Sequence, residues 1–324
     1  MSCAGHFVCV TSVQTIAGSK RVWILFVGDG RVGNQVFQYA ALSALAPPNA
    51  RIFAVGLEDL AGMFELRGPR CQVLRGGVWI KRIVLYVVRP LLLRPLARWL
   101  RLFGYARELE TQGRHGGSDG AVEVRAGLFS GLLFVDGGFY QNSEYWPRVF
   151  PPACMELKEC WRAEARALLA ARLGARAGDA FFLHVRRGDY VGFTCYGVGD
   201  LLLPLEYFLR AIEAVRAHSS RPLVVVTDDA AWVESAFAHI PDRVVVSTNP
   251  RLDFAVMAQC GAGIVSNSTY ALAAAMFMHA PDIVYAPQYW FGFRVRQWLP
   301  PRIRFAHQRI VYLPVSLPPM ADAA

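Results

Sequence analysis

Two adjacent arginines end a short apolar run in the segment FFLHVRRGDY, residues 181–190. A guanidinium group can bind two phosphate oxygens at once, so Arg186 and Arg187 predict an anion site. Side chains alternate along a strand, so the two arginines point to different sides, and the next residue is a glycine that lets the loop turn back. His184 and Asp189 complete the group. The alternative is a surface ion pair between an arginine and Asp189 behind a buried strand.

The elements that must position these residues follow a regular pattern from about residue 155. Short apolar runs alternate with amphipathic helical segments, which predicts a buried parallel sheet covered on both faces, as in a Rossmann-like domain. We expect helices at 155–173, 205–218, 230–237, 252–260 and 269–279, and strands at 181–185, 223–226, 243–246, 264–265 and 283–285.

Polar residues follow four of these strands directly. In such sheets ligands bind outside the carboxyl ends of the strands, so we expect the four clusters to share one binding edge. They are Arg186-Arg187, Thr227-Asp228-Asp229, Thr248-Asn249 and Ser266-Asn267-Ser268.

The N-terminal half begins with a strand, a helix and a second strand, at 22–27, 34–46 and 51–55. Its glycines at 28, 30 and 33 fit the G-x-G-x-x-G pattern of dinucleotide-binding turns, so an NAD(P)-dependent oxidoreductase is one alternative. Two features argue against this alternative. Arg31 would crowd a pyrophosphate, and the nearest acidic pair, Glu58-Asp59, lies further along the chain than the acidic residue of a dinucleotide-binding pattern.

Several sequence blocks carry a resemblance to one enzyme family. Residues 30–40, GRVGNQVFQYA, resemble the opening signature of family 11 glycosyltransferases, the alpha-1,2-fucosyltransferases, and HVRRGDY at 184–190 resembles the donor motif of that family. The chain departs from the family in the helix after Ser268, where Thr269-Tyr270-Ala replaces the aromatic residues usual in the family. The resemblance therefore does not define the shape of the donor pocket. Supporting blocks occur in order at 136–141 with Tyr145-Trp146, at 227–232, at 264–270 and at 286–290.

The resemblance implies a GT-B architecture, an α/β fold of two facing Rossmann-like domains with parallel sheets and a cleft between them. We expect an extension at 1–20, an acceptor-side domain at 21–150 and a GDP-sugar-binding domain at 151–324. The implied reaction moves L-fucose from GDP-fucose to the 2-hydroxyl of a galactose-type acceptor with inversion. It implies no cofactor, no metal and no nucleic-acid partner. A catalytically inactive GDP-sugar-binding protein is a further alternative.

Within this resemblance the catalytic loop receives provisional roles. Arg187 would bind the β-phosphate of the leaving group, and Arg186 would join it or orient the loop. Asp189 would brace an arginine or act as general base, and Asp136 is the rival candidate for the base. His184 is expected to order the loop by a hydrogen bond.

The remaining predicted site residues would bind the nucleotide or the sugars. Asp228 and Asp229 either order the nucleotide or cap the next helix. The hydroxyl and amide groups that open the helix at 269 would bind phosphate, cap that helix, or do both. Asp253 would read guanine or merely begin its helix. The polar loop comprises Ser266, Asn267, Ser268 and Thr269, and the first motif adds Gly33, Asn34 and Gln35, with Gln38, as residues that face the sugars.

Composition sets limits on this picture. The chain is 54% hydrophobic and 18% charged, as in globular proteins, and its net charge of +9 favours anionic partners. Only three of its 34 basic residues are lysines, so the charge is almost entirely arginine. Seven scattered cysteines without a C-x-x-C pair predict a reduced cytoplasmic protein without a zinc site.

One apolar stretch, residues 79–103, is interrupted by six basic residues and two prolines. Such a basic amphipathic segment is typical of helices that lie on a membrane surface. The alternative is a pair of ordinary domain helices whose arginines face solvent. The cytoplasmic location therefore includes peripheral contact with the inner membrane as an open possibility.

Overall fold

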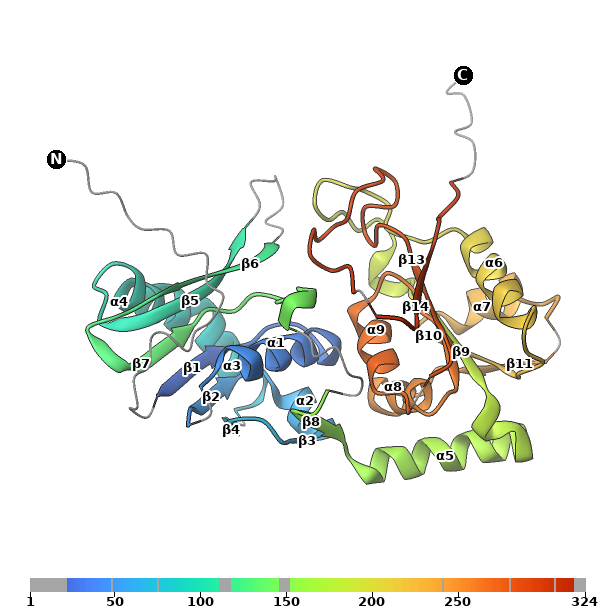
Figure 1. Ribbon diagram of the computed structural model, residues 1–324, viewed down its shortest axis with the longest axis horizontal. Coiled ribbons are helices and arrows are strands. Elements are labelled where there is room, and N and C mark those ends of the chain that lie inside the picture. Colours follow the sequence, from blue (N-terminus) through green and yellow to red (C-terminus); the bar gives the residue numbers. More distant parts are fainter. Residues whose placement is uncertain are drawn as a thin grey trace, which may run out of the picture.

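The computed structural model describes residues 22–317, apart from 48, 75, 111–117, 146–151, 241, 280 and 306. The expected extension at 1–20 and Trp146 lie outside the described residues. The described chain forms two α/β halves that lie side by side (Figure 1). This confirms the predicted fold class.

The first half is built on a six-stranded sheet in the order β4-β2-β1-β7-β5-β6. Neighbouring strands are parallel except β6, which runs antiparallel to β5. The strand-helix-strand start is confirmed, whereas the later strands were not assigned from sequence. The elements are β1 (Trp23–Val27), α1 (Val32–Leu45), β2 (Arg51–Val55), α2 (Glu58–Met63), β4 (Arg70–Val73), β5 (Phe103–Glu110), β6 (Ser118–Arg125) and β7 (Phe129–Val135).

The second half contains a six-stranded sheet in which all neighbours are parallel, in the order β11-β10-β9-β12-β13-β14. The central strands β9 and β10 are buried at every residue, because helices cover both faces of the sheet. The elements are β9 (Phe181–Val185), α6 (Leu205–Arg216), β10 (Leu223–Thr227), α7 (Ala230–Ala236), β11 (Arg243–Val246), α8 (Pro250–Ala258), β12 (Ala262–Ile264), α9 (Thr269–Met276), β13 (Val284–Pro287) and β14 (Ile310–Leu313).

The two halves are packed into one body. The chain between the two sheets contains the 3-10 turn η3 (Ser143–Tyr145), the strand β8 (Met155–Leu157), the helix α5 (Glu159–Leu173) and the 3-10 turn η4 (Gly174–Asp179). β8 pairs with β3 (Phe64–Leu66) in a two-stranded ribbon. A single apolar cluster runs through both halves. Within it Phe37 of α1 packs on Phe305, with ring centroids 5.9 Å apart, and Phe64 packs on Phe254 at 5.6 Å. This apolar contact fixes how the two sheets face each other.

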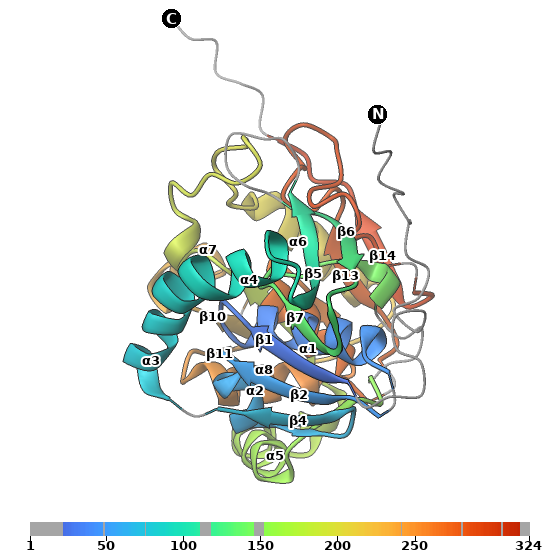
Figure 2. The same cartoon turned by 90° about the vertical axis from the view of Figure 1, so that its left-hand side faces the viewer.

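Residues 77–98 form a continuous helical path made of α3 (Gly77–Ile83), the π-helical stretch η2 (Val84–Leu93) and α4 (Arg94–Arg98). In Figure 2, α3 and α4 lie across the face of the first half that is turned toward the viewer. The expectation that the arginines face solvent is wrong for Arg89 and Arg94. Their Nε atoms lie 2.5 and 2.7 Å from the two carboxylate oxygens of the buried Asp136. None of the helices in the described ranges has the length and apolar character needed to cross a membrane.

Candidate functional site

The two arginines lie just past the carboxyl end of β9, on a loop that makes the 3-10 turn η5 (Gly188–Tyr190). The guanidinium of Arg186 contacts both carboxylate oxygens of Asp189 at 2.8 Å, and its Nη1 lies 2.9 Å from Asp228. Burial opposes the charged form of Arg186, but the carboxylates outweigh it and raise the pKa of this guanidinium. Arg186 is therefore a fixed cation that holds the loop.

Arg187 is held differently from its neighbour. Its Nε lies 3.1 Å from Asp229, and its guanidinium carbon lies 4.2 Å from the centre of the Trp232 ring, a cation-π contact. The backbone N–H of Arg187 also donates to Asp228 at 2.9 Å. Sequence reasoning assigned no role to Trp232, although its place in the first turn of α7, directly after the Asp pair, points to this contact.

The acidic pair after β10 combines two tasks. Asp229 accepts a hydrogen bond from the backbone N–H of Trp232 at 3.1 Å and so caps α7, while its other oxygen pairs with Arg187. Asp228 contacts Arg186 and lies so close to Gly188 that a Cβ at this glycine would be 2.7 Å from its Oδ2. The capping and loop-ordering interpretations therefore hold together.

His184 lies on β9 beneath this loop and is only 3% exposed. Its Nδ1 is 2.8 Å from the Ser266 hydroxyl, so it links β9 to the loop after β12. Burial, aided by the positive charge of Arg186, lowers the pKa of His184 from 6.5 to about 3. The imidazole is neutral at physiological pH and braces the loop, as expected.

The polar loop before α9 is largely buried. Asn267 donates from its side-chain amide to the Leu201 carbonyl at 2.8 Å and accepts from the Tyr190 hydroxyl on its own carbonyl at 3.1 Å. Ser268 is the N-cap residue of α9, and no hydrogen bond from its side chain caps the helix in the described structure. The first N–H groups of α9 are therefore not capped by the Ser268 side chain, and they lie at the same sheet edge as the two arginines.

Asp253 lies in the first turn of α8, facing Thr248 after β11. Its Oδ1 accepts hydrogen bonds from the backbone N–H and the hydroxyl of Thr248, at 3.1 and 2.7 Å. Burial raises the pKa of Asp253 although these two bonds oppose the shift. Since both Thr248 donors use Oδ1, a ligand N–H would bind at Oδ2.

The first motif meets the second half at the start of α9. Gly33 packs so tightly there that a Cβ would lie 2.6 Å from the backbone N and Cα of Tyr270. Beside it, Oδ1 of Asn34 accepts hydrogen bonds from the Thr269 hydroxyl at 2.9 Å and from the Gln141 amide at 3.3 Å. The altered residues Thr269-Tyr270 thus form part of the contact between the halves.

The expectation that Gln35 and Gln38 face the sugars is wrong. Both side chains are buried, and their amide groups donate to backbone carbonyls of Gly30, Asp29 and Gly138. Gln35 also accepts from the backbone N–H of Leu60 at 2.9 Å. These amides hold the glycine turn closed, and with Tyr270 packed on Gly33 they occupy the end of α1 where a dinucleotide phosphate would lie. The oxidoreductase alternative is not favoured.

The two candidates for the general base are both engaged with arginine. Asp136 is held between Arg89 and Arg94 and also accepts from the Tyr105 hydroxyl at 2.9 Å, so both of its oxygens are engaged in this structure. Asp189 pairs with Arg186, which is the bracing arrangement.

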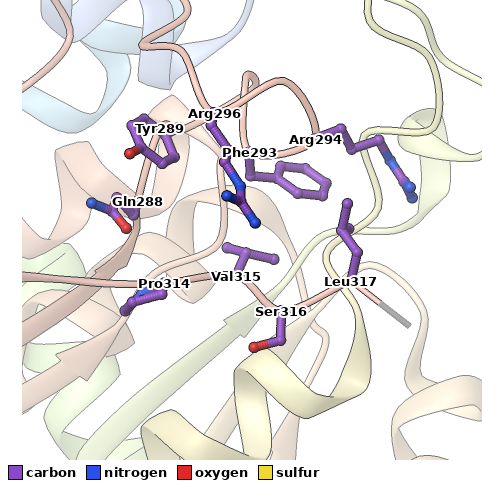
Figure 3. A pocket seen from close by; sticks show the side chains of 9 residues that line it. All are labelled: Gln288, Tyr289, Phe293, Arg294, Arg296, Pro314, Val315, Ser316 and Leu317. Atoms are coloured by element: carbon purple, nitrogen blue, oxygen red, sulfur yellow. The ribbon is translucent and has the colours of Figure 1, made fainter. Parts of the chain in front are cut away.

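A pocket of about 490 Å³ opens further along the same sheet edge, beyond β13 and β14 (Figure 3). Arg294 and Arg296 are its basic residues. The predicted nucleotide-binding residues do not line this pocket. No group of three or more His, Cys, Asp or Glu side chains in the described part of the chain is placed to hold a metal ion. The other residues that line the pocket are Gln288, Tyr289, Phe293, Pro314, Val315, Ser316 and Leu317.

Comparisons with known proteins find similar glycosyltransferases. Over 295 residues the chain is 28% identical to the galactoside alpha-(1,2)-fucosyltransferase 1 of Oryctolagus cuniculus, which covers 88% of this chain and 69% of that protein. Over 116 residues it is 32% identical to the O-antigen biosynthesis glycosyltransferase WbnK of Escherichia coli, covering 34% of this chain but only 38% of that protein.

The fold has a counterpart among solved structures. A glycosyl transferase family 9 protein from Veillonella parvula superposes with a TM-score of 0.50 at 11% identity, over 92% of this chain and 87% of that one. This likeness concerns the fold alone, and it confirms the expected GT-B-like arrangement of two Rossmann-like halves. The model described as "Glycosyl transferase family 11" matches residues 139–291, which include the donor motif at 184–190. Over residues 139–291, and in the motif blocks on both sides of the interface, the chain is therefore similar to glycosyl transferase family 11.

Proposed function

We propose that this protein transfers L-fucose from GDP-fucose to the 2-hydroxyl of a galactose-type acceptor. The observation that carries the proposal is the pair of loop arginines, held at the carboxyl edge of the second sheet beside the start of α9. This is the edge where ligands bind in parallel α/β sheets. The relatives named above include an enzyme described as a galactoside alpha-(1,2)-fucosyltransferase, which supports the same donor and acceptor classes.

In the proposed reaction, the acceptor oxygen attacks the anomeric carbon of fucose as the bond to the β-phosphate oxygen breaks. The acceptor hydroxyl gives its proton to a general base, GDP leaves, and the anomeric configuration inverts. Negative charge grows on the leaving diphosphate, so a fixed cation at that position lowers the barrier. The ion pairs around the loop indicate which arginine takes this part.

The two arginines would divide the work. Arg186 uses Nε, Nη1 and Nη2 in its contacts with Asp189 and Asp228, so its task is to hold the loop. Arg187 contacts Asp229 through Nε, and its terminal nitrogens are the donors that we assign to the diphosphate. Trp232 beneath the guanidinium keeps it in the orientation that this role requires.

The nucleotide would lie along the same edge. The N–H groups that begin α9 are suited to phosphate oxygens, and Oδ2 of Asp253 could accept hydrogen bonds from the N1 and N2 hydrogens of guanine. In this proposal the arginines replace a divalent metal. A cytoplasmic location, which the scattered cysteines favour, would supply the donor.

A transfer assay tests the proposal. Purified protein is incubated with GDP-fucose and a panel of galactosides, with and without chelator, and NMR identifies the linkage in the product. We expect an alpha-1,2 product with undiminished yield in the chelator. A product with another linkage, or turnover that requires added metal, would contradict the proposal. Tight GDP binding without transfer to any galactoside would favour the inactive sugar-nucleotide binder.

A further inference from the structure

The helical path at 77–98 turns large apolar side chains toward solvent, the reverse of an ordinary domain helix. Trp79 and Tyr86 are each 75% exposed, Leu91 is 73% exposed and Trp99 is 78% exposed. Leu128, in the turn that enters β7, is another exposed apolar residue. We call these five residues the apolar surface. Large apolar side chains exposed together along one segment are typical of an interaction site.

The apolar surface is held in place by charge on the opposite side of the same helices. Arg89 and Arg94 reach inward to the buried carboxylate of Asp136, and Ala97 packs against the sheet. Removing either arginine would leave a buried carboxylate with less compensation, which is costly. The helices are therefore anchored with their apolar side outward, and a partner would meet a preformed surface.

The charge around the apolar surface identifies the partner. No Asp or Glu occurs between residues 66 and 107, while Lys81, Arg82, Arg98 and Arg101 lie within the helical path or just after it. Arg82 and Arg98 lie over the Trp79 and Trp99 rings, at 5.8 and 6.0 Å from the ring centres. Aromatic and aliphatic side chains bordered by arginines fit the boundary between acyl chains and anionic headgroups of a bilayer.

A second copy of the chain fits this surface less well. Self-association through the apolar surface would bring the four cations of one copy close to those of the other, with no acidic residue in the same segment to compensate. Like charges brought together across an interface oppose association. A bilayer that contains anionic lipid meets both the apolar and the charge requirement.

We propose that the apolar surface docks this protein on anionic lipid bilayers, with the helices at 77–98 lying in the plane of the membrane surface. The inference does not depend on the proposed transferase activity. Each basic residue near the headgroups changes the partition onto the membrane about fivefold, so two of them account for about 25-fold.

Co-sedimentation of the full chain with lipid vesicles tests the proposal. One set of vesicles contains phosphatidylcholine with about 30% phosphatidylglycerol, which gives the surface a negative potential, and the other contains phosphatidylcholine alone. The surface variant combines Arg82→Gln, Arg98→Gln and Trp99→Ser. A matched control combines Arg166→Gln and Arg172→Gln on α5 with Val311→Ser on β14, the same kinds of change outside the surface. Circular dichroism and GDP binding verify that each variant is folded.

We expect the parent and the control to bind the anionic vesicles, with binding that falls as salt rises, and the surface variant to bind at least 25-fold more weakly. Vesicles that carry brominated phosphatidylglycerol should quench the tryptophan fluorescence of the parent, a readout that needs no variant. Equal binding by the surface variant and the parent would overturn the proposal. The proposal would also be overturned if the parent did not bind the vesicles and instead formed a dimer in sedimentation velocity that the surface variant did not form.

Discussion

Replacing the buried His184 by asparagine should change how the stability of this protein depends on pH. An asparagine amide can still form a hydrogen bond with the Ser266 hydroxyl, but it cannot titrate. In the folded protein the pKa of His184 lies near 3, against 6.5 for the free side chain. Below pH 6.5 the unfolded chain therefore binds a proton that the folded chain refuses, and acid favours unfolding.

The size of the effect follows from that difference. The contribution of His184 to the free energy of unfolding is complete above pH 6.5 and is lost as the pH falls toward 3. Each pH unit well below 6.5 costs about 1.4 kcal/mol, and the first unit costs less because the unfolded histidine is already half protonated at pH 6.5. Between pH 6.5 and 4.5 the parent should therefore lose about 2 kcal/mol more than the His184→Asn variant.

Urea unfolding at several pH values between 4.5 and 7.5 measures both proteins under the same conditions. Carboxylates contribute to the slope in each protein, so the difference between the two curves isolates the histidine. A matched control is His218→Gln, at an exposed histidine beyond α6, which should keep the parent slope. Parallel curves for the parent and His184→Asn would refute the conclusion that His184 is buried and neutral.

Three further changes test separate parts of the site. Gly33→Ala places a Cβ against the Tyr270 backbone and should lower the free energy of unfolding by roughly 1–3 kcal/mol in urea titrations. Gly178→Ala, where a Cβ meets nothing within 4 Å, should be nearly neutral, and equal effects would contradict the contact between the halves. Trp232→Ala removes the ring under Arg187 and should slow fucosyl transfer about 3- to 30-fold, while Trp232→Phe should retain most of the rate, so equal rates in both variants would argue against this support. Asp253→Asn should abolish a preference of roughly tenfold for GDP over inosine diphosphate, which lacks the N2 amino group, in competition binding; a parent without that preference would reject the guanine contact.

The parts of the fold that could be predicted are those whose sequence pattern has one structural solution. The run Phe181–Val185 is apolar at every position but His184, which fits a strand buried on both faces, and it became the central β9. The short strands β3 and β4 carry no such pattern and were not predicted. The predicted helix at 155–173 is wrong at its start, because residues 155–157 pair with β3 as the strand β8 and the helix α5 begins only at Glu159. The strand β14 follows an irregular stretch after β13, and its pairing with β13 is a contact at long range that local periodicity cannot reveal.

The candidate site shows the same division. The sequence alone placed Arg186 and Arg187 at a sheet edge, because the end of a strand follows from local pattern. It could not show that Gln35 and Gln38 turn inward to backbone carbonyls, since an amide near a helix start fits an exposed or a buried role equally well. The inward turn of Arg89 was also hidden, because its partner Asp136 is far along the chain.

Arg187 is the residue on which the proposed mechanism depends most, because it is assigned to stabilise the departing diphosphate. The direct test is the single-turnover rate of fucosyl transfer from GDP-fucose, in the presence of chelator, for the parent, Arg187→Ala and Arg187→Lys. We expect Arg187→Ala to be about 100- to 1,000-fold slower and Arg187→Lys to fall between the two, because lysine keeps the charge but loses the planar fork. An Arg187→Ala variant that transfers fucose at the rate of the parent would contradict the mechanism.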